Sequence, residues 1–377
     1  MFVDKDYMVR IRRELHQVPE IGFDLPKSLA IIRRELASIG LPYREDVGRS
    51  CIIATLNEGV ENQTIALRAD FDGLPIEEKT GLPFASLHPG QMHACGHDCH
   101  AAMLLGTAKA LKAMEKDLTC CIKFVFQAAE ETLSGAKTIC DCGFMDGVDK
   151  ILACHIEPDY PVGTVLLNRN CDSACSRGFK LHLYGKAAHV ARPHQGVDAI
   201  AMAARVYDGI QVMKQTLSEP VIIGVGAIHG GETNNIICDH VMMNVSLRTQ
   251  ETSLDKRIYD RITQIAEDIA AEMGGKAMLE TYKYTPALRN DLVVADEVET
   301  AAKKAGISEI LPKPDSMTAE DFAFYLQHKP GAIFWIGAKP ENGETVSLHN
   351  EKLVINEDAL DVAPKIFTQY ILDQMER

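Results

Sequence analysis

The chain has 377 residues, of which 46% are hydrophobic and 24% are charged, and its formal net charge is −14. This length suits two domains, and the composition is that of an ordinary globular protein. The sequence has no run rich in lysine and arginine that could form a phosphate-binding stripe, so we expect no nucleic-acid partner.

The sequence also speaks against a membrane or secreted location. Its start, MFVDKDYMVRIRREL, lacks the apolar segment of a secretory signal, and no stretch approaches the roughly 20 apolar residues of a membrane span. Eleven cysteines, an odd number, predict reduced thiols rather than a disulfide framework. We therefore expect a cytoplasmic protein. The missing CxxC spacing also makes a thiol redox protein the weaker alternative.

The first part of the chain alternates helices with short strands. Residues 28–40 and 101–115 have the apolar spacing of helices, and Gly40 is a common type of helix end. The strands that we expect here are 51–56, 64–70 and 120–127. This order predicts an α/β domain with a mostly parallel sheet and helices on both faces.

The middle of the chain has the order strand, helix, strand, strand, helix, strand. The expected elements are 178–186, 198–217, 220–228, 240–249, 253–273 and 276–285. This βαββαβ order predicts an α+β, ferredoxin-like sheet with two helices on one face. The α/β pattern then resumes with helices at 296–306, 319–327 and from 358, and a strand at 332–337. We predict a discontinuous catalytic domain, 1–175 and 288–377, and an inserted lid domain, 176–287.

Polar residues of the first domain gather after predicted strands, after the apolar run KILAC at 150–154, or before a helix. They are Asp70, Asp72, Cys95, His97, Glu130, Glu131, His155 and His349. Thiolate, imidazole and carboxylate are the ligand types of zinc and similar ions. Of two adjacent acids, one can bind a metal while the other moves protons. Two alternatives remain for the stretch QMHACGHDCH at 91–100. It could be a structural zinc site, or a loop whose histidines cap the following helix.

The inserted domain offers polar groups for a ligand. His189 and His194 follow a strand, and Asn234 and Asn235 lie in a loop rich in glycine and asparagine. Arg248 ends a strand, where its planar side chain could hold a carboxylate through two hydrogen bonds. Each of these residues could equally be an ordinary turn or surface residue.

Six segments together resemble a known family. They are ALRADFDGLPIEEKTGLPFAS, MHACGHDCH, FVFQAAEE, ACHIEPDYPVGT, GKAAHVARPH and SLHN. They are similar to the dinuclear metallo-aminoacylase and carboxypeptidase superfamily, in the family's order and over nearly the whole chain. The similarity is greatest to its N-acyl-amino-acid amidohydrolase branch, which includes hippurate hydrolase, N-acetyldiaminopimelate deacetylase and the auxin-conjugate hydrolases. The resemblance implies the same two-domain fold.

The resemblance also implies roles for individual residues. Two divalent ions, Zn²⁺ or Mn²⁺ with Ni²⁺ or Co²⁺ as further options, would be held by Cys95, His97, Glu131, His155 and His349. Glu130 would be the general base, and Asp70, in preference to Asp72, would orient a ligand. His189 would stabilise the oxyanion, in the partner's site of a homodimer formed through the lid. Asn234, Asn235, His194 and Arg248 would contact the substrate.

The activity implied is hydrolysis of the amide bond of N-acyl amino acids. A metallo-dipeptidase or carboxypeptidase acting on small peptides is the alternative, and a metal-loaded binding protein without turnover is a third possibility. The chain departs from the family pattern at Ala128, where proline is usual, and after the two acids, where it lacks the usual glycine. These departures spare the implied ligands and base, so they bear on the substrate more than on the reaction.

Overall fold

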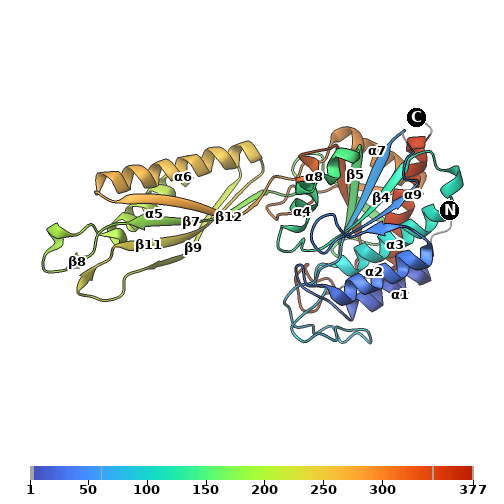
Figure 1. Ribbon diagram of the computed structural model, residues 1–377, viewed down its shortest axis with the longest axis horizontal. Coiled ribbons are helices and arrows are strands. Elements are labelled where there is room, and N and C mark those ends of the chain that lie inside the picture. Colours follow the sequence, from blue (N-terminus) through green and yellow to red (C-terminus); the bar gives the residue numbers. More distant parts are fainter. Residues whose placement is uncertain (1–3, 61, 342–343, 376–377) are drawn as a thin grey trace. The chain divides into compact units, whose positions relative to one another are not determined.

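Figure 1 shows the computed structural model, which describes residues 4–60, 62–341 and 344–375. The chain divides into two compact units. The first unit runs up to Asp172 and resumes at 289–315 and from Asp321 onward. The second unit consists of 173–288 and 316–320. It includes the short segment 316–320, which the sequence assigns to the catalytic domain.

The first unit is built on an eight-stranded sheet in the order β1-β2-β4-β3-β5-β14-β6-β13. Four of its seven strand pairings are parallel, which confirms the predicted mostly parallel sheet. Buried β-branched and aromatic residues fill the central strands, as expected for strands covered on both faces. The strands are β1 (Tyr43–Arg44), β2 (Ile52–Leu56), β3 (Thr64–Asp70), β4 (Cys121–Gln127), β5 (Lys150–Glu157), β6 (Thr164–Leu167), β13 (Glu309–Pro312) and β14 (Gly331–Gly337).

Helix α3 (His97–Ala113) lies in the core of the first unit. It is buried around most of its circumference, because it packs against other helices as well as against β3, β4 and β5. The other α-helices of this unit are α1 (Lys5–His16), α2 (Pro26–Ile39), α4 (Gly135–Asp141), α7 (Leu292–Lys304), α8 (Ala323–Leu326) and α9 (Val362–Met375). Its short 3-10 helices are η1 (Glu115–Asp117), η2 (Phe144–Gly147) and η4 (Glu357–Asp361).

The second unit has a four-stranded antiparallel sheet in the order β12-β7-β11-β9. Helices α5 (Ala199–Gln215) and α6 (Thr252–Glu272) cover one face of this sheet (Figure 1). This arrangement confirms the predicted ferredoxin-like lid fold. The strands are β7 (Cys175–Tyr184), β9 (Val221–Gly230), β11 (His240–Thr249) and β12 (Lys276–Thr285). A two-stranded sheet of β8 (Ala188–His189) and β10 (Ile236–Ile237) and the 3-10 helix η3 (Pro193–Gln195) complete the unit.

Some expectations fail at short elements. The predicted helix 319–327 is helical only over Ala323–Leu326. The helices α1 and α4 and the strands β5, β6 and β13 are among the elements without a sequence prediction. The described residues form no disulfide, and ten of the eleven cysteines are buried. Among the described residues, no helix has the length and apolar character needed to cross a membrane.

Candidate metal centre

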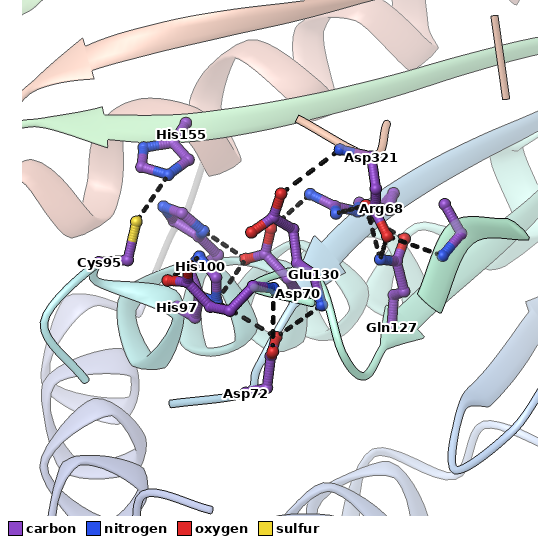
Figure 2. A network of polar contacts seen from close by, with 12 residues as sticks. Arg68, Asp70, Asp72, Cys95, His97, His100, Gln127, Glu130, His155 and Asp321 are labelled. Carbon is purple, nitrogen blue, oxygen red and sulfur yellow. Dashed lines mark hydrogen bonds and ion pairs between the residues drawn. The ribbon is translucent and has the colours of Figure 1, made fainter. Parts of the chain in front are cut away.

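The candidate site lies at the carboxyl ends of three neighbouring strands. Asp70 is the last residue of β3, Glu130 follows β4, and His155 lies near the end of β5. These three strands are parallel, so their carboxyl ends meet at one edge of the sheet, which is where α/β proteins place their ligands. Helix α3 begins at the same place with His97, and Figure 2 shows these side chains converging.

Gly96 allows this helix to begin against β5. Its φ is +79°, and a Cβ atom at this position would lie 2.4 Å from Cδ1 of Ile156. A side chain there would combine backbone strain with a clash. Gly96 therefore lets Cys95 and His97, on either side of it, approach the end of β5.

The structure brings the five expected ligands together. Sγ of Cys95 lies 3.5 Å from Nε2 of His155, and Nε2 of His97 lies 3.9 Å from Oε1 of Glu131. Nε2 of His349 lies 3.5 Å from Oε2 of Glu131. Ligand atoms lie within 4.8 Å of one another in the group Cys95, His97 and His155 and in the group Cys95, Glu131 and His349. Cys95 belongs to both groups.

The donor atoms and the charge of the site fit divalent cations. Both ring nitrogens of His97 and Oε1 of Glu131 are buried, and none forms a hydrogen bond with the part of the chain that the structure describes. Burial raises the pKa of Glu131 to about 7 and raises that of the Cys95 thiol well above its usual value. For His97, burial opposes protonation, but Asp70 and Cys95 outweigh it and raise the pKa. Buried nitrogen and oxygen atoms without a hydrogen-bond partner are suited to binding a cation.

The main chain of Ile156 fixes the tautomers of two histidines. Its carbonyl oxygen lies 2.7 Å from Nδ1 of His155, so this nitrogen carries the proton and donates. Its N–H donates to Nε2 of His100 over 3.0 Å, so the proton of His100 is on Nδ1, which faces Oδ1 of Asp70 at 2.6 Å. Burial, and after it the neighbouring His100, lowers the pKa of His155. The lone pair on Nε2 of His155 therefore points toward Cys95, as a metal ligand requires.

The two aspartates after β3 contact different partners. Asp70 is held by His100 and by Arg68, whose Nη1 lies 2.5 Å from Oδ2 of Asp70. Asp72 is nearer to His97, with 3.4 Å between Oδ1 and Nδ1, whereas the corresponding distance to Asp70 is 3.8 Å. Asp72 also accepts the main-chain N–H of Glu130 (Figure 2) and that of Glu131. The resemblance favours Asp70 as the residue that orients a ligand, but Asp72 lies closer to the expected ligand His97.

A buried network of charged and polar side chains around Arg68 holds Asp70 at the edge of the site. Arg68 donates to Asp70, to Oε1 of Gln127 at 3.0 Å and to Oδ1 of Asp321 at 2.9 Å. Gln127 donates to both carboxylate oxygens of Asp321, and the N–H of Asp321 lies 3.4 Å from Oε1 of Glu130. Sequence reasoning missed these residues. The signal was Arg68 itself, a charge inside the apolar strand TIALRAD that needs a buried counterion.

Three residues around the site have a left-handed backbone without being glycine. Ala129 precedes the acids with φ +59°, Leu133 follows them with φ +54°, and His349 has φ +64°. Leu133 lies in the segment where the family's glycine is missing. The N–H of His349 donates to the carbonyl oxygen of Ala94 over 2.7 Å. Such conformations are costly for residues with a Cβ atom, and they concentrate at functional sites.

A second buried cluster lies beside the start of α3. Oδ2 of Asp98 forms an ion pair with Arg12, 2.8 Å from its Nε, and lies 2.7 Å from Nδ1 of His16. Nε2 of His16 lies 3.3 Å from Oε1 of Glu78. Burial raises the pKa of Glu78, but His16, Thr80 and the N–H of Ser86 outweigh it and lower the value to about 2. This cluster ties α1 to the turn that carries the candidate ligands.

The second unit separates its expected substrate contacts into two groups. His189 pairs with Ile236, and the N–H of Val190 donates to the carbonyl oxygen of Asn235, so His189 adjoins the asparagine loop. His194 lies in the neighbouring η3, and both histidines are exposed. Arg248 lies near the end of β11 that is far from His240, whereas His189 lies beyond the His240 end. Nη1 of Arg248 donates to the carbonyl oxygen of Met317 at 3.1 Å.

An α/β sheet that carries clustered thiolate, imidazole and carboxylate donors at its carboxyl edge, together with a ferredoxin-like unit, defines a metal-binding hydrolase. The chain belongs to the peptidase family M20/M25/M40, whose sequence model matches residues 66–373. This match confirms the resemblance seen in the motifs. The chain is thus a hydrolase of this family.

Individual relatives give a consistent picture. The chain is 38% identical over 356 residues to an N-acetyl-L-cysteine deacetylase of Bacillus subtilis, covering 94% of this chain and 84% of the relative. It is 32% identical over 379 residues to an N-acetyldiaminopimelate deacetylase of Streptococcus uberis, covering 98% and 99%. A solved dinuclear metal-binding M20 peptidase of Bacillus subtilis matches with a TM-score of 0.86 and 30% identity, covering 99% and 98%.

Proposed function

We propose that this protein hydrolyses the amide bond of N-acyl amino acids to a carboxylic acid and a free amino acid. The observation that carries the proposal is the pair Glu130 and Glu131, whose main-chain N–H groups are both held by Asp72 beside the clustered donors. One acid can then bind metal while the other moves protons. The two relatives named as deacetylases of N-acetylated amino acids support this substrate class.

We infer that Cys95, His97, Glu131, His155 and His349 hold two divalent ions, with the Cys95 thiolate shared. Membership of Cys95 in both donor groups supports this sharing. When bound, the ions would polarise the scissile carbonyl and lower the pKa of the attacking water. Zinc and manganese are our candidates, and nickel and cobalt are compatible with the same thiolate, imidazole and carboxylate donors.

Glu130 is the proposed general base. Its side chain is 6% exposed, and its carboxylate lies in one donor group with His97 and Glu131. It would take a proton from the attacking water and return it to the nitrogen of the leaving amino acid. Proton transfer of this kind contributes about 10²–10⁴ to the rate.

His189 is the proposed oxyanion donor. Its Nδ1 accepts the N–H of Ala191 over 3.1 Å, so a neutral imidazole carries its proton on Nε2 and can donate from there. Asn234, Asn235 and His194 adjoin it and would contact the substrate. Arg248 would bind the substrate carboxylate through its planar guanidinium.

We further propose a homodimer through the second unit. Arg248 and His240 lie eight residues apart along β11, about 27 Å. His189 lies beyond the His240 end, so one copy cannot offer His189 and Arg248 to the same small substrate. A second copy that supplies His189 would remove this difficulty.

The second unit offers a surface for such a dimer. Among the described strands β9 pairs with β11 alone, so its outer edge is open. Ile200 and Ile228 are each 51% exposed and line a groove of about 360 Å³ between α5 and β9. An open strand edge beside exposed apolar side chains is suited to pairing with another chain. The absence of disulfides among the described residues suits the reducing cytoplasm that we propose as its location.

The decisive experiment combines metal exchange with a substrate panel. Protein stripped by a chelator is reconstituted with Zn²⁺, Mn²⁺, Co²⁺ or Ni²⁺ and assayed on N-acetyl, N-benzoyl and long-chain N-acyl amino acids, with dipeptides as the alternative substrates. Glu130→Gln should keep its metal and lose turnover, whereas Glu131→Gln should lose metal. Faster turnover of dipeptides would favour the dipeptidase or carboxypeptidase alternative. Full activity of Glu130→Gln would overturn the assigned base.

A further inference from the structure

Trp335 is the chain's only tryptophan, and it lies against a candidate metal ligand. It is on β14, where its register partner on the parallel strand β5 is His155. The two rings have centroids 4.2 Å apart and an interplanar angle of 32°. Neighbouring strands therefore place the indole directly on the imidazole.

The other edges of His155 are also occupied. His100 contacts it edge to face at 4.5 Å between centroids, and Nδ1 donates to Ile156. Only Nε2, the nitrogen that faces Cys95, is left for a ligand. A tilt of the ring would therefore have to displace the indole or His100.

Trp335 is itself held by a buried charge pair. Its Nε1 lies 3.1 Å from each carboxylate oxygen of Asp172, whose side chain is fully buried. Lys313 donates to Asp172 over 3.2 Å, and its ammonium lies 4.4 Å from the centroid of the indole ring. A buried carboxylate is expensive unless it is paired and hydrogen-bonded, so this arrangement fixes the indole in one orientation.

We infer that Trp335 is a positioning residue for the metal centre. It sets the ring plane of His155 so that Nε2 meets the metal, and Asp172 and Lys313 hold the indole for this purpose. The inference rests on the proposed metal centre and adds to it a residue that touches no metal. Outer partners of metal ligands typically change metal affinity by about 10–100-fold when they are removed.

The test measures metal release from the loaded protein to a chromogenic chelator. In Trp335→Leu, one of the two ions should be released about 10–100-fold more readily than in the wild type. Trp335→Phe keeps an aromatic face on His155 and should recover most of this loss. The matched control is Phe334→Leu, which truncates a buried aromatic residue of the same strand that packs on Phe367 instead. This control should lose thermal stability and keep both affinities.

Tryptophan fluorescence gives a second readout. Because Trp335 is the only tryptophan, its emission should fall when paramagnetic Co²⁺ replaces the ion at His155, and His155→Asn should make this change smaller. Unchanged metal affinity in Trp335→Leu, or equal weakening in Phe334→Leu, would overturn the positioning role. If the wild type binds no metal at all, the proposed metal centre itself fails. The two failures are therefore distinguishable.

Discussion

The carboxylate of Asp72 accepts the main-chain N–H of Glu130, with 3.1 Å between Oδ1 and nitrogen. Its second oxygen accepts the N–H of Glu131 over 3.2 Å. One side chain after β3 therefore fixes the turn after β4 that carries both acids. Its Oδ1 also lies 3.4 Å from Nδ1 of His97, so the same carboxylate faces a proposed ligand.

Removing this carboxylate should damage catalysis and metal binding together. We expect Asp72→Ala to lower metal affinity by about 10–100-fold, because both Glu131 and His97 lose an orienting partner. Asp72→Asn keeps one acceptor oxygen and should lose less. Metal content by mass spectrometry and kcat/KM measure the two effects. Wild-type values in Asp72→Ala would contradict the positioning role.

Removing the positive charge of the buried network should destabilise the fold. Arg68→Met leaves Asp70 and Asp321 without their buried partner, and breaking such a pair typically costs about 3–5 kcal/mol. Urea unfolding of the metal-loaded proteins measures the difference. The control Arg44→Met removes an exposed pair with Asp46 and should leave the unfolding midpoint unchanged. Equal midpoints for both variants would argue against the network.

Substitutions of His155 and of His100 should affect metal binding in different ways, although the two rings are in contact. His155→Asn should reduce bound metal from two ions to one, because a proposed ligand is lost. His100→Phe removes the bonds to Asp70 and Ile156 and should retain both ions with affinity lower by about 10–100-fold. Equilibrium dialysis with Co²⁺ separates loss of a site from weakening of a site. Two ions bound to His155→Asn would remove it from the ligand set.

Acid should weaken the protein partly through Glu78. Its folded pKa of about 2 lies below an unfolded value of about 4.3, so its stabilising effect is complete above that value. This stabilisation, on the order of 3 kcal/mol at most, is lost as the pH falls from about 5 toward 2. The unfolding free energy of Glu78→Gln should therefore converge with that of the wild type at low pH. The exposed control Glu58→Gln should follow the wild type throughout. A constant difference between Glu78→Gln and the wild type would contradict this.

The proposed dimer surface can be tested by one charge. Ile228→Lys places an ammonium group on the open edge strand β9 and should shift the protein to monomers in analytical ultracentrifugation. Val293→Lys adds the same charge at a more exposed position on α7, 64% exposed, and should leave the assembly as in the wild type. A wild-type protein that sediments as a monomer would remove the dimer from the proposal.

The sequence predicts most of the long, strongly patterned elements, but it misses helix α1, strand β5 and most of the short elements. TIALRAD and CCIKFVFQ carry enough buried β-branched and aromatic residues to identify β3 and β4. β6 and β13 have four residues each, too few for a pattern, and they are held by strand pairing, β13 with β6 and β6 also with β14. The apolar spacing of 319–327 suggests a helix, but the helix spans only Ala323–Leu326. Asp321, just before it, accepts bonds from the distant Arg68 and Gln127, which the spacing does not reveal.

For the site, too, the sequence reveals some features and not others. The residue types after each strand identify donors, and the parallel order of β3, β4 and β5 explains why they meet. Contacts between distant segments leave no such pattern. Trp335 and Asp172 are 163 positions apart, and nothing in AIFWIG or CDSAC indicates that they touch. The choice between Asp70 and Asp72 likewise depends on distances of a few tenths of an ångström.

The two histidine tautomers depend on the N–H and C=O of residue 156, atoms that every amino acid except proline possesses. Exchange of the isoleucine side chain would leave both hydrogen bonds in place, subject only to its packing against Gly96. Only proline, which has no N–H, would break one of them. Part of the chemistry of this protein is thus encoded in the path of its main chain, where a comparison of aligned residues would not detect it.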